Sequence, residues 1–156
     1  NHKSDDMVNL NNYNKNIGLL FFQPSTRTRM SFEVAAKNNG FNTIIDCNPE
    51  VNSAMAKQET LHDLLKTMSN YVDTIVLRHP NEKEVFDNIK GIDIPIINGG
   101  WGNYEHPTQA LIDLYTFYKT MDDLENSRLC IVGDPNTRTN ISISKLGKRL
   151  YPNPKV

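Results

Sequence analysis

Phe21-Phe22-Gln23-Pro24-Ser25-Thr26-Arg27-Thr28-Arg29 is the stretch around which the chain is organised. An apolar run ends here at a proline and gives way to hydroxyl and guanidinium side chains, and a helix-like segment, Met30 to Lys37, follows directly. Free backbone N–H groups at a helix start attract anions, and the helix dipole adds about half a positive charge there. The stretch therefore predicts a strand, a turn and a helix N-terminus that together bind an oxyanion, with two arginines completing the field.

The composition is that of an ordinary globular protein. The chain has 156 residues and a formal net charge of -1, which allows one domain, or one domain and the beginning of another. Proteins that bind polyanions usually carry a large basic excess, so this balance of charge argues against nucleic acid as a partner. No apolar run approaches the roughly 20 residues that span a bilayer, and the first residues lack the pattern of a signal peptide. We expect a soluble protein that binds no membrane.

Two cysteines bear on the compartment. Cys47 and Cys130 lie in separate apolar runs without the spacing of metal ligands, so we expect buried free thiols rather than a disulfide or a zinc site. Free thiols fit an intracellular, reducing compartment, and we predict a cytoplasmic location.

Short apolar runs alternate with segments of helical periodicity along the chain. After an irregular Asn-rich lead-in over residues 1–16, the runs predict strands at residues 17–22, 42–47, 73–78, 95–98 and 129–134. The other segments predict helices at residues 26–39, 60–68, 81–89, from 107 through 118, and 141–150, with a flexible Gly-rich loop at residues 99–102. This alternation predicts an α/β fold in which a doubly wound parallel sheet carries helices on both faces.

Local signals mark where several of these helices begin and end. Ser25 is a plausible N-cap, and Gly40 stands where a helix often ends in a left-handed residue. Thr60 and Asp63 have the spacing of a capping box, and Pro107 fits the first position of a helix.

Polar clusters follow four of the predicted strands. They are Ser25–Arg29, Arg78-His79, His106–Gln109 and Asp134–Arg138. Ligands of such sheets bind beyond the carboxyl ends of the strands, near the point where the strand order reverses. We therefore expect one crevice to gather the four clusters.

Several motifs, in order, resemble those of a known family. Residues 21–33 closely resemble the carbamoyl phosphate signature of the aspartate and ornithine carbamoyltransferases. Arg78-His79-Pro80 and His106-Pro107-Thr108-Gln109 are similar to its strand-end arginine and its histidine–glutamine motif. Ser53 and Lys57, ahead of Glu59-Thr60, resemble its loop that reaches into a neighbouring subunit. Thr108 and the proline before Ser25 resemble the aspartate branch, since the ornithine branch usually has cysteine at the position of Thr108.

The resemblance implies a reaction and an assembly. The family's aspartate branch transfers the carbamoyl group of carbamoyl phosphate to the amine of L-aspartate, giving N-carbamoyl-L-aspartate and phosphate for pyrimidine biosynthesis. It implies no metal and no organic cofactor, and a homotrimer with sites at the subunit interfaces. Two alternatives stay open: a carbamoyltransferase for another amine such as ornithine, and a non-catalytic phosphate-binding or regulatory remnant.

Roles for the site residues follow from the same resemblance. Ser25, Thr26, Arg27 and Thr28 would bind the phosphate of carbamoyl phosphate, with Arg27 and Thr28 also acting in catalysis. Arg78 would bridge the phosphate and the carbonyl oxygen. His106 would polarise that carbonyl together with Thr28, and Gln109 would orient the carbamoyl NH₂ group. Ser53 and Lys57 would act in the site of a neighbouring subunit, and Arg138 would face a carboxylate of aspartate.

The resemblance also suggests how the chain divides. Residues 17–124 would form the carbamoyl phosphate-binding domain, and residues 125–156 the first strand and helix of a second α/β domain that binds the amino acid. We therefore expect a fragment that lacks turnover on its own. Gln23 stands where the aspartate branch usually has a glutamate that ties the two domains together.

Three further residues carry weaker expectations. Trp101 either lines the site or is a loop aromatic, and the sequence does not separate the two. His62 and His79 are interpreted as structural.

Overall fold

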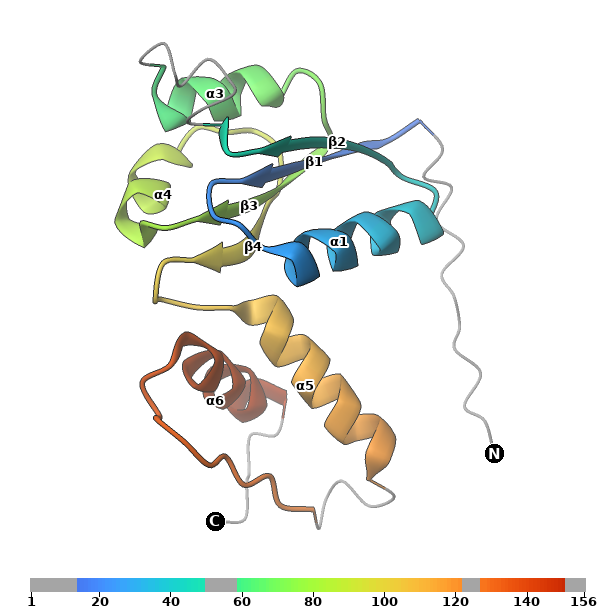
Figure 1. Cartoon of the computed structure of the whole chain (residues 1–156), viewed down its shortest axis with the longest axis vertical. Coiled ribbons are helices and arrows are strands. Elements are labelled where there is room, and N and C mark those ends of the chain that lie inside the picture. Colours follow the sequence, from blue (N-terminus) through green and yellow to red (C-terminus); the bar gives the residue numbers. More distant parts are fainter. Residues whose placement is uncertain (1–13, 50–58, 122–126, 151–156) are drawn as a thin grey trace.

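The structure is a computed structural model of the whole chain, and it describes residues 14–49, 59–121 and 127–150 (Figure 1). The predictions for Ser53 and Lys57, and for most of the lead-in over residues 1–16, lie outside the described residues. The division at residue 124 also lies outside them and stays a prediction.

A parallel sheet forms the centre of the described chain. Its strands are β1 (Asn16–Phe21), β2 (Asn42–Cys47), β3 (Thr74–His79) and β4 (Ile96–Trp101). They lie in the order β2-β1-β3-β4, so the chain first moves to one side of β1 and then returns to the other. The predicted doubly wound sheet is confirmed, and its switch point lies between β1 and β3.

Helices lie on both faces of this sheet (Figure 1). They are α1 (Thr26–Asn38), α3 (Leu61–Met68), α4 (Glu82–Asn88), α5 (Pro107–Thr120) and α6 (Arg138–Leu150). Helix α1 covers one face, α3 and α4 cover the other, and α5 packs beside α6 beyond the carboxyl end of β4. No helix in the described part of the chain is long and apolar enough to cross a bilayer.

The alternation of side chains along β1 explains its unbroken apolar sequence. Leu19 and Phe21 point to one face, where they pack with Phe32 of α1. Leu20 and Phe22 point to the other, into a core that includes three leucines of α3. Because successive residues of a strand face opposite sides, a strand covered on both faces must be apolar throughout.

Most of the local signals act as expected. The Thr60 hydroxyl accepts a hydrogen bond from the backbone N–H of Asp63 (3.1 Å), which caps α3. Gly40 follows α1 with a φ of 79°, and Pro107 opens α5. Ser25 occupies the N-cap position of α1, but its side chain makes no cap hydrogen bond.

The glycine-rich segment at residues 99–102 differs from its prediction as a loop. Strand β4 continues through Gly99 and Gly100 to Trp101, opposite an irregularity in β3 between Leu77 and His79. A Cβ atom on Gly99 would lie 3.2 Å from the Leu77 carbonyl oxygen, so glycine allows the close approach. The Trp101 indole Nε1 donates to the same oxygen (2.9 Å), and the ring is only 8% exposed. Trp101 is therefore a core residue rather than a loop aromatic.

The predicted strand at residues 129–134 is wrong for the described chain. These residues form no strand and pair with none of the described strands, and Val132 is 93% exposed. An apolar run becomes a strand only where a neighbour supplies hydrogen-bond partners, and none of the described segments does so here. Cys130, in the same run, is exposed and Cys47 is half-buried, so the expected burial of both thiols is wrong.

Helix α6 begins at Arg138, three residues before the predicted start at Ile141. The difference matters for the site, because it places Arg138 in the first turn of a helix instead of in a loop.

Candidate functional site

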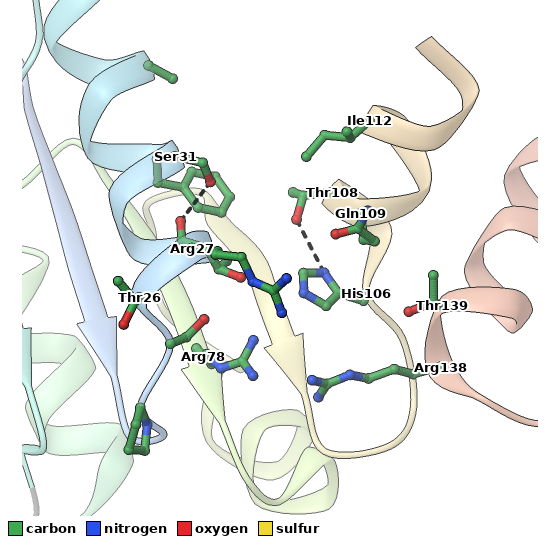
Figure 2. Close-up of a pocket in the computed structure, with 15 residues that line it drawn as sticks. Thr26, Arg27, Ser31, Arg78, His106, Thr108, Gln109, Ile112, Arg138 and Thr139 are labelled. Carbon is green, nitrogen blue, oxygen red and sulfur yellow. Dashed lines mark hydrogen bonds between the residues drawn. The ribbon is translucent and has the colours of Figure 1, made fainter. Parts of the chain in front are cut away.

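A pocket of about 960 Å³ lies beyond the carboxyl ends of β1 and β3, at the switch point of the sheet. Its walls come from the N-terminus of α1, the end of β3, and the starts of α5 and α6 (Figure 2). Arg27, Arg78, His106 and Arg138 project into it from these four places (Figure 2). Each of the four polar clusters contributes at least one residue to this pocket, as expected. Asp134 lines only a second pocket that adjoins it.

The N-terminus of α1 provides the backbone part of the site. Ser25, Thr26, Arg27 and Thr28 all line the pocket. The first backbone N–H groups of a helix have no partner within the helix, and the Ser25 hydroxyl is not used as a cap. These groups and the positive end of the helix dipole therefore face the pocket together.

Arg29, the second arginine of the Ser25–Arg29 stretch, pairs with a carboxylate of its own helix. Arg29 Nη1 lies 2.9 Å from a carboxylate oxygen of Glu33, whose other oxygen pairs with Lys37. Arg29 does not line the main pocket, so only Arg27 of this motif contributes its charge there. The expectation that both arginines of this stretch complete the anion site is therefore wrong for Arg29, and Arg78 from β3 lines the pocket with Arg27 instead.

Arg78 is a buried cation held by backbone atoms. Its side chain Nη1 donates to the Gly99 carbonyl oxygen (3.1 Å), while its buried Nε has no hydrogen-bond partner in the described part of the chain. Gly100 has a φ of 114°, and a Cβ on it would lie 2.7 Å from that Nη1. The backbone angle therefore favours glycine, and a larger residue would also require the Arg78 guanidinium to shift.

Arg138 lies close to Arg78 at the pocket wall. Its Nη1 donates to the Gly102 carbonyl oxygen (2.7 Å), and it lines both the main pocket and an adjoining one of about 880 Å³. Burial and the charge of Arg138 both lower the pKa of Arg78. Of the described residues that line the main pocket, none carries a carboxylate, so its cationic charge is left for a ligand to neutralise.

His106 stands at the start of α5 and is 9% exposed. Its backbone N–H donates to the Ser142 hydroxyl (2.9 Å), and its Nδ1 lies 3.4 Å from the Thr108 hydroxyl. Burial, followed by the charges of Arg138 and Arg78, lowers the pKa of His106 below its ordinary value of 6.5. The imidazole is therefore neutral near pH 7 and has one N–H to donate.

Gln109 and the glycines complete the site. Gln109 lines the pocket and its Nε2 donates to Asp113 (2.9 Å), which fixes the direction of the amide. The sequence did not predict that the carbonyl oxygens of Gly99 and Gly102 accept hydrogen bonds from Arg78 and Arg138. The spacing Gly99-Gly100-Trp101-Gly102 was the available signal, but it indicated a flexible loop.

The arrangement suits an anion with a carbonyl group beside it. Three guanidiniums, a helix N-terminus and hydroxyl groups can bind a phosphate, and a neutral histidine N–H can polarise an adjacent carbonyl oxygen. The described residues form no cluster of three or more His, Cys, Asp or Glu that could hold a metal ion.

Comparison with known proteins places the chain in a family. A model of the aspartate/ornithine carbamoyltransferase carbamoyl-P binding domain matches residues 1–119. The chain is 48% identical over 112 residues to the ureidoglycine carbamoyltransferase of Rubrobacter xylanophilus, covering 72% of this chain and 33% of that protein. It is 47% identical over 118 residues to the aspartate carbamoyltransferase catalytic subunit of Haloquadratum walsbyi, covering 76% and 38%.

A solved structure agrees with these relatives. The aspartate transcarbamoylase of Trypanosoma cruzi, in complex with carbamoyl phosphate and aspartate, superimposes with a TM-score of 0.80 at 33% identity. The match covers 88% of this chain and 45% of that one. The chain thus spans less than half the length of these relatives. The matched residues include the α1 N-terminus, the end of β3 and the start of α5, and the chain belongs to the aspartate/ornithine carbamoyltransferase family.

Proposed function

We propose that this chain forms the carbamoyl phosphate site of an enzyme that transfers the carbamoyl group to the amine of L-aspartate. The products are N-carbamoyl-L-aspartate and phosphate, in the route to pyrimidines. The observation that carries the proposal is the carboxylate-free pocket at the switch point, where Arg27, Arg78 and Arg138 surround His106. Relatives named for aspartate carbamoyl transfer support the acceptor.

Phosphate binding is the first step of this proposal. The dianion binds at the backbone N–H groups of Thr26, Arg27 and Thr28, where the helix dipole is positive. The Arg27 guanidinium and the hydroxyls of Ser25 and Thr26 supply further donors. Because these donors are already in place, little reorganisation is needed when the anion arrives.

Carbamoyl transfer follows beside the phosphate. The amine nitrogen attacks the carbamoyl carbon, negative charge develops on the carbonyl oxygen, and Arg78, His106 and Thr28 stabilise that charge. The bond from this carbon to the phosphate oxygen then breaks, and the departing phosphate accepts the amine proton. The neutral form of His106, favoured by its surroundings, is a hydrogen-bond donor in this step rather than a proton source. Gln109 orients the carbamoyl NH₂, and Arg138 faces a carboxylate of the acceptor.

The assembly is part of the same proposal. Ser53 and Lys57 complete the site of a neighbouring subunit in a homotrimer located in the cytoplasm. The family resemblance supports these statements.

Phosphate binding to this chain tests the core of the proposal. Isothermal calorimetry with inorganic phosphate should show binding that Arg27→Ala weakens by about tenfold or more, because a charge-assisted contact of roughly 1.5–3 kcal/mol is lost. Arg29→Ala is a matched control, since this arginine pairs with Glu33 and lies outside the main pocket. No phosphate binding, or equal losses in both variants, would count against the proposed site.

A different acceptor is the second candidate function. The relative with 48% identity is named a ureidoglycine carbamoyltransferase, and Gln23, in the pocket beside Arg138, is an amide rather than a carboxylate. Aspartate is distinguished from another acceptor by comparing the affinity of the chain for N-(phosphonacetyl)-L-aspartate with its affinity for phosphonoacetamide, which lacks the aspartyl group. Tighter binding of the aspartyl compound supports aspartate, and equal binding of the two removes this support for aspartate.

A further inference from the structure

One face of α6 contacts the loop that leads from β4 to α5. Arg138, Ser142 and Lys145 are spaced at i, i+4 and i+7, so they lie on the same side of the helix. Arg138 donates to the Gly102 carbonyl oxygen, and Ser142 accepts from the backbone N–H of His106. This face of α6 therefore holds two of the proposed site residues, Arg138 itself and the backbone of His106.

Lys145 is the third contact on this face and lies outside the pocket. Its ammonium forms an ion pair with Glu105, and it stands 4.8 Å from the ring centre of Tyr104. Glu105 and Tyr104 immediately precede His106. A cation held by both a carboxylate and an aromatic face is restrained in two directions.

Tyr104 is itself anchored to the sheet. Its ring packs edge-on against Phe86 of α4 at 5.4 Å, and Phe86 packs edge-on against Trp101 at 5.5 Å. The Trp101 indole is buried and hydrogen-bonded to the Leu77 carbonyl oxygen in β3. The surface that Lys145 contacts is therefore connected through aromatic contacts to the core of the sheet.

A restraint on α6 is needed because of the charges in the pocket. Arg138 and Arg78 repel each other, and none of the described residues lining the main pocket offers a carboxylate to compensate. The repulsion acts on the first turn of α6 and tends to move it away from the sheet. Contacts farther along the same helix face oppose that movement.

We propose that Lys145 is a positioning residue: by binding Glu105 and Tyr104, it holds α6 so that Arg138 stays beside Arg78 at the acceptor side of the pocket. The inference rests on the proposed function for the role of Arg138, but the contacts themselves do not. It predicts that removing Lys145 weakens the binding of ligands that reach Arg138. The binding of ligands that contact only the α1 N-terminus should not change.

Calorimetry on the chain with two probes tests this prediction. Lys145→Met should weaken N-(phosphonacetyl)-L-aspartate by about fivefold, the combined size of an exposed ion pair and a cation–π contact, and leave inorganic phosphate within about twofold. Lys145→Arg should bind both probes within about twofold of the original chain, because arginine retains the charge and the aromatic contact. Lys148→Met, which removes an exposed lysine from the same helix, is the matched control.

Two measurements keep the outcome clear. Emission from Trp101, the single tryptophan of the chain, should be unchanged in Lys145→Met if the sheet domain remains folded. Exchange of the His106 amide hydrogen, bonded to Ser142, should be faster in Lys145→Met than in Lys148→Met even without ligand. Equal losses for both probes, or unchanged probe affinity, would overturn the proposal, and so would unchanged exchange. A failure of the original chain to bind phosphate would contradict the proposed function instead, and the exchange comparison would still decide the role of Lys145.

Discussion

Arg78 illustrates how a single residue can carry an uncompensated charge at a buried position. The side chain is 8% exposed, and its described hydrogen-bond partner is a backbone carbonyl of Gly99 rather than a carboxylate. A carbonyl orients the guanidinium without neutralising it, so the charge remains available to an anion. A carboxylate partner in the same place would have satisfied the arginine and weakened the attraction for phosphate.

His106 responds to this charge, and its titration is a direct test. Because burial, Arg138 and Arg78 lower the pKa of the folded state, His106 should titrate below 6.5 by NMR. Bound phosphate should raise the pKa by offsetting the two guanidiniums. A His106 pKa above 6.5 in the free chain, or one indifferent to phosphate, would contradict the electrostatic picture of the pocket.

The same shift has a consequence for stability. Between the folded-state pKa and 6.5, the unfolded chain binds more protons at His106 than the folded chain does. The contribution of this residue therefore lowers the free energy of unfolding as the pH falls through that window. His106→Asn should make the free energy of unfolding depend less steeply on pH. Urea unfolding at several pH values between 7.5 and about 5.5 measures this dependence.

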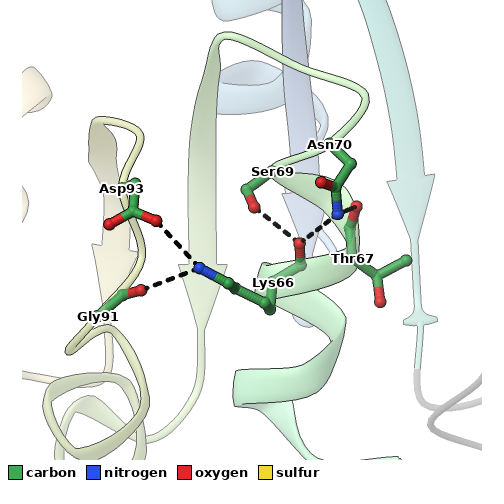
Figure 3. Close-up of polar contacts among 6 residues, drawn as sticks. All are labelled: Lys66, Thr67, Ser69, Asn70, Gly91 and Asp93. Carbon is green, nitrogen blue, oxygen red and sulfur yellow. Dashed lines mark hydrogen bonds and ion pairs between the residues drawn. The ribbon is translucent and has the colours of Figure 1, made fainter.

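At the scale of elements, α3 shows how a short helix is joined to its surroundings. The hydroxyl of Ser69 and the amide of Asn70 both donate to the Lys66 carbonyl oxygen near its C-terminus (Figure 3). The Lys66 ammonium reaches out to the Gly91 carbonyl oxygen (3.4 Å) and to Asp93 (3.0 Å), just before β4 (Figure 3). The helix end is thus tied to the segment that leads into the next strand.

The strength of this tie can be compared with the apolar packing of the same helix. The Lys66 and Asp93 side chains are 51% and 84% exposed, so Lys66→Met should lower the free energy of unfolding by less than about 1 kcal/mol. Leu65, the residue before Lys66 in α3, is fully buried, and Leu65→Ala should lower the free energy of unfolding by about 2–5 kcal/mol. Urea unfolding of both variants measures the difference, and equal costs would show that the ion pair matters more than its exposure suggests.

At the scale of the whole molecule, the apolar residues form separate clusters. Two of them cover the faces of the sheet, and the third joins Ala110 and Leu114 of α5 to Ile143 of α6. Arg138 belongs to α6, so one wall of the candidate site depends on the smallest of these clusters. The site is therefore assembled from two parts, and we expect their stabilities to differ because their apolar clusters differ in size.

Hydrogen exchange can reveal this difference. Ile143→Ala should speed exchange in α6 and leave the amides of β1 and β3 protected, because it removes packing only from the third cluster. Ile75→Ala is the matched control: Ile75 is fully buried in the sheet, so its loss should lower protection throughout the molecule. Uniform loss of protection in Ile143→Ala would show that the clusters unfold together.

The sequence predicted strands well where both faces are buried. The run at residues 17–22 matched β1 to within a residue at each end, because a strand covered on both sides leaves a continuous apolar signal. The predictions for residues 99–101 and 129–134 were wrong in opposite ways: a predicted loop is a strand, and a predicted strand is not one. Glycines that read as a loop continue β4 because β3 lies close beside them, whereas an apolar run that reads as a strand has no described neighbour to pair with.

The sequence by itself determined the parallel α/β architecture, the helix start at Ser25–Thr28, and the family to which the chain belongs. These features depend on residues that are close together in the sequence: apolar periodicity, helix signals and ordered motifs. Only the tertiary structure decided which arginines share the pocket, because that depends on partners distant in the chain. Arg29 forms an ion pair with Glu33. Arg78 and Arg138 donate instead to the backbone carbonyl oxygens of Gly99 and Gly102, which leaves their charges available to a ligand.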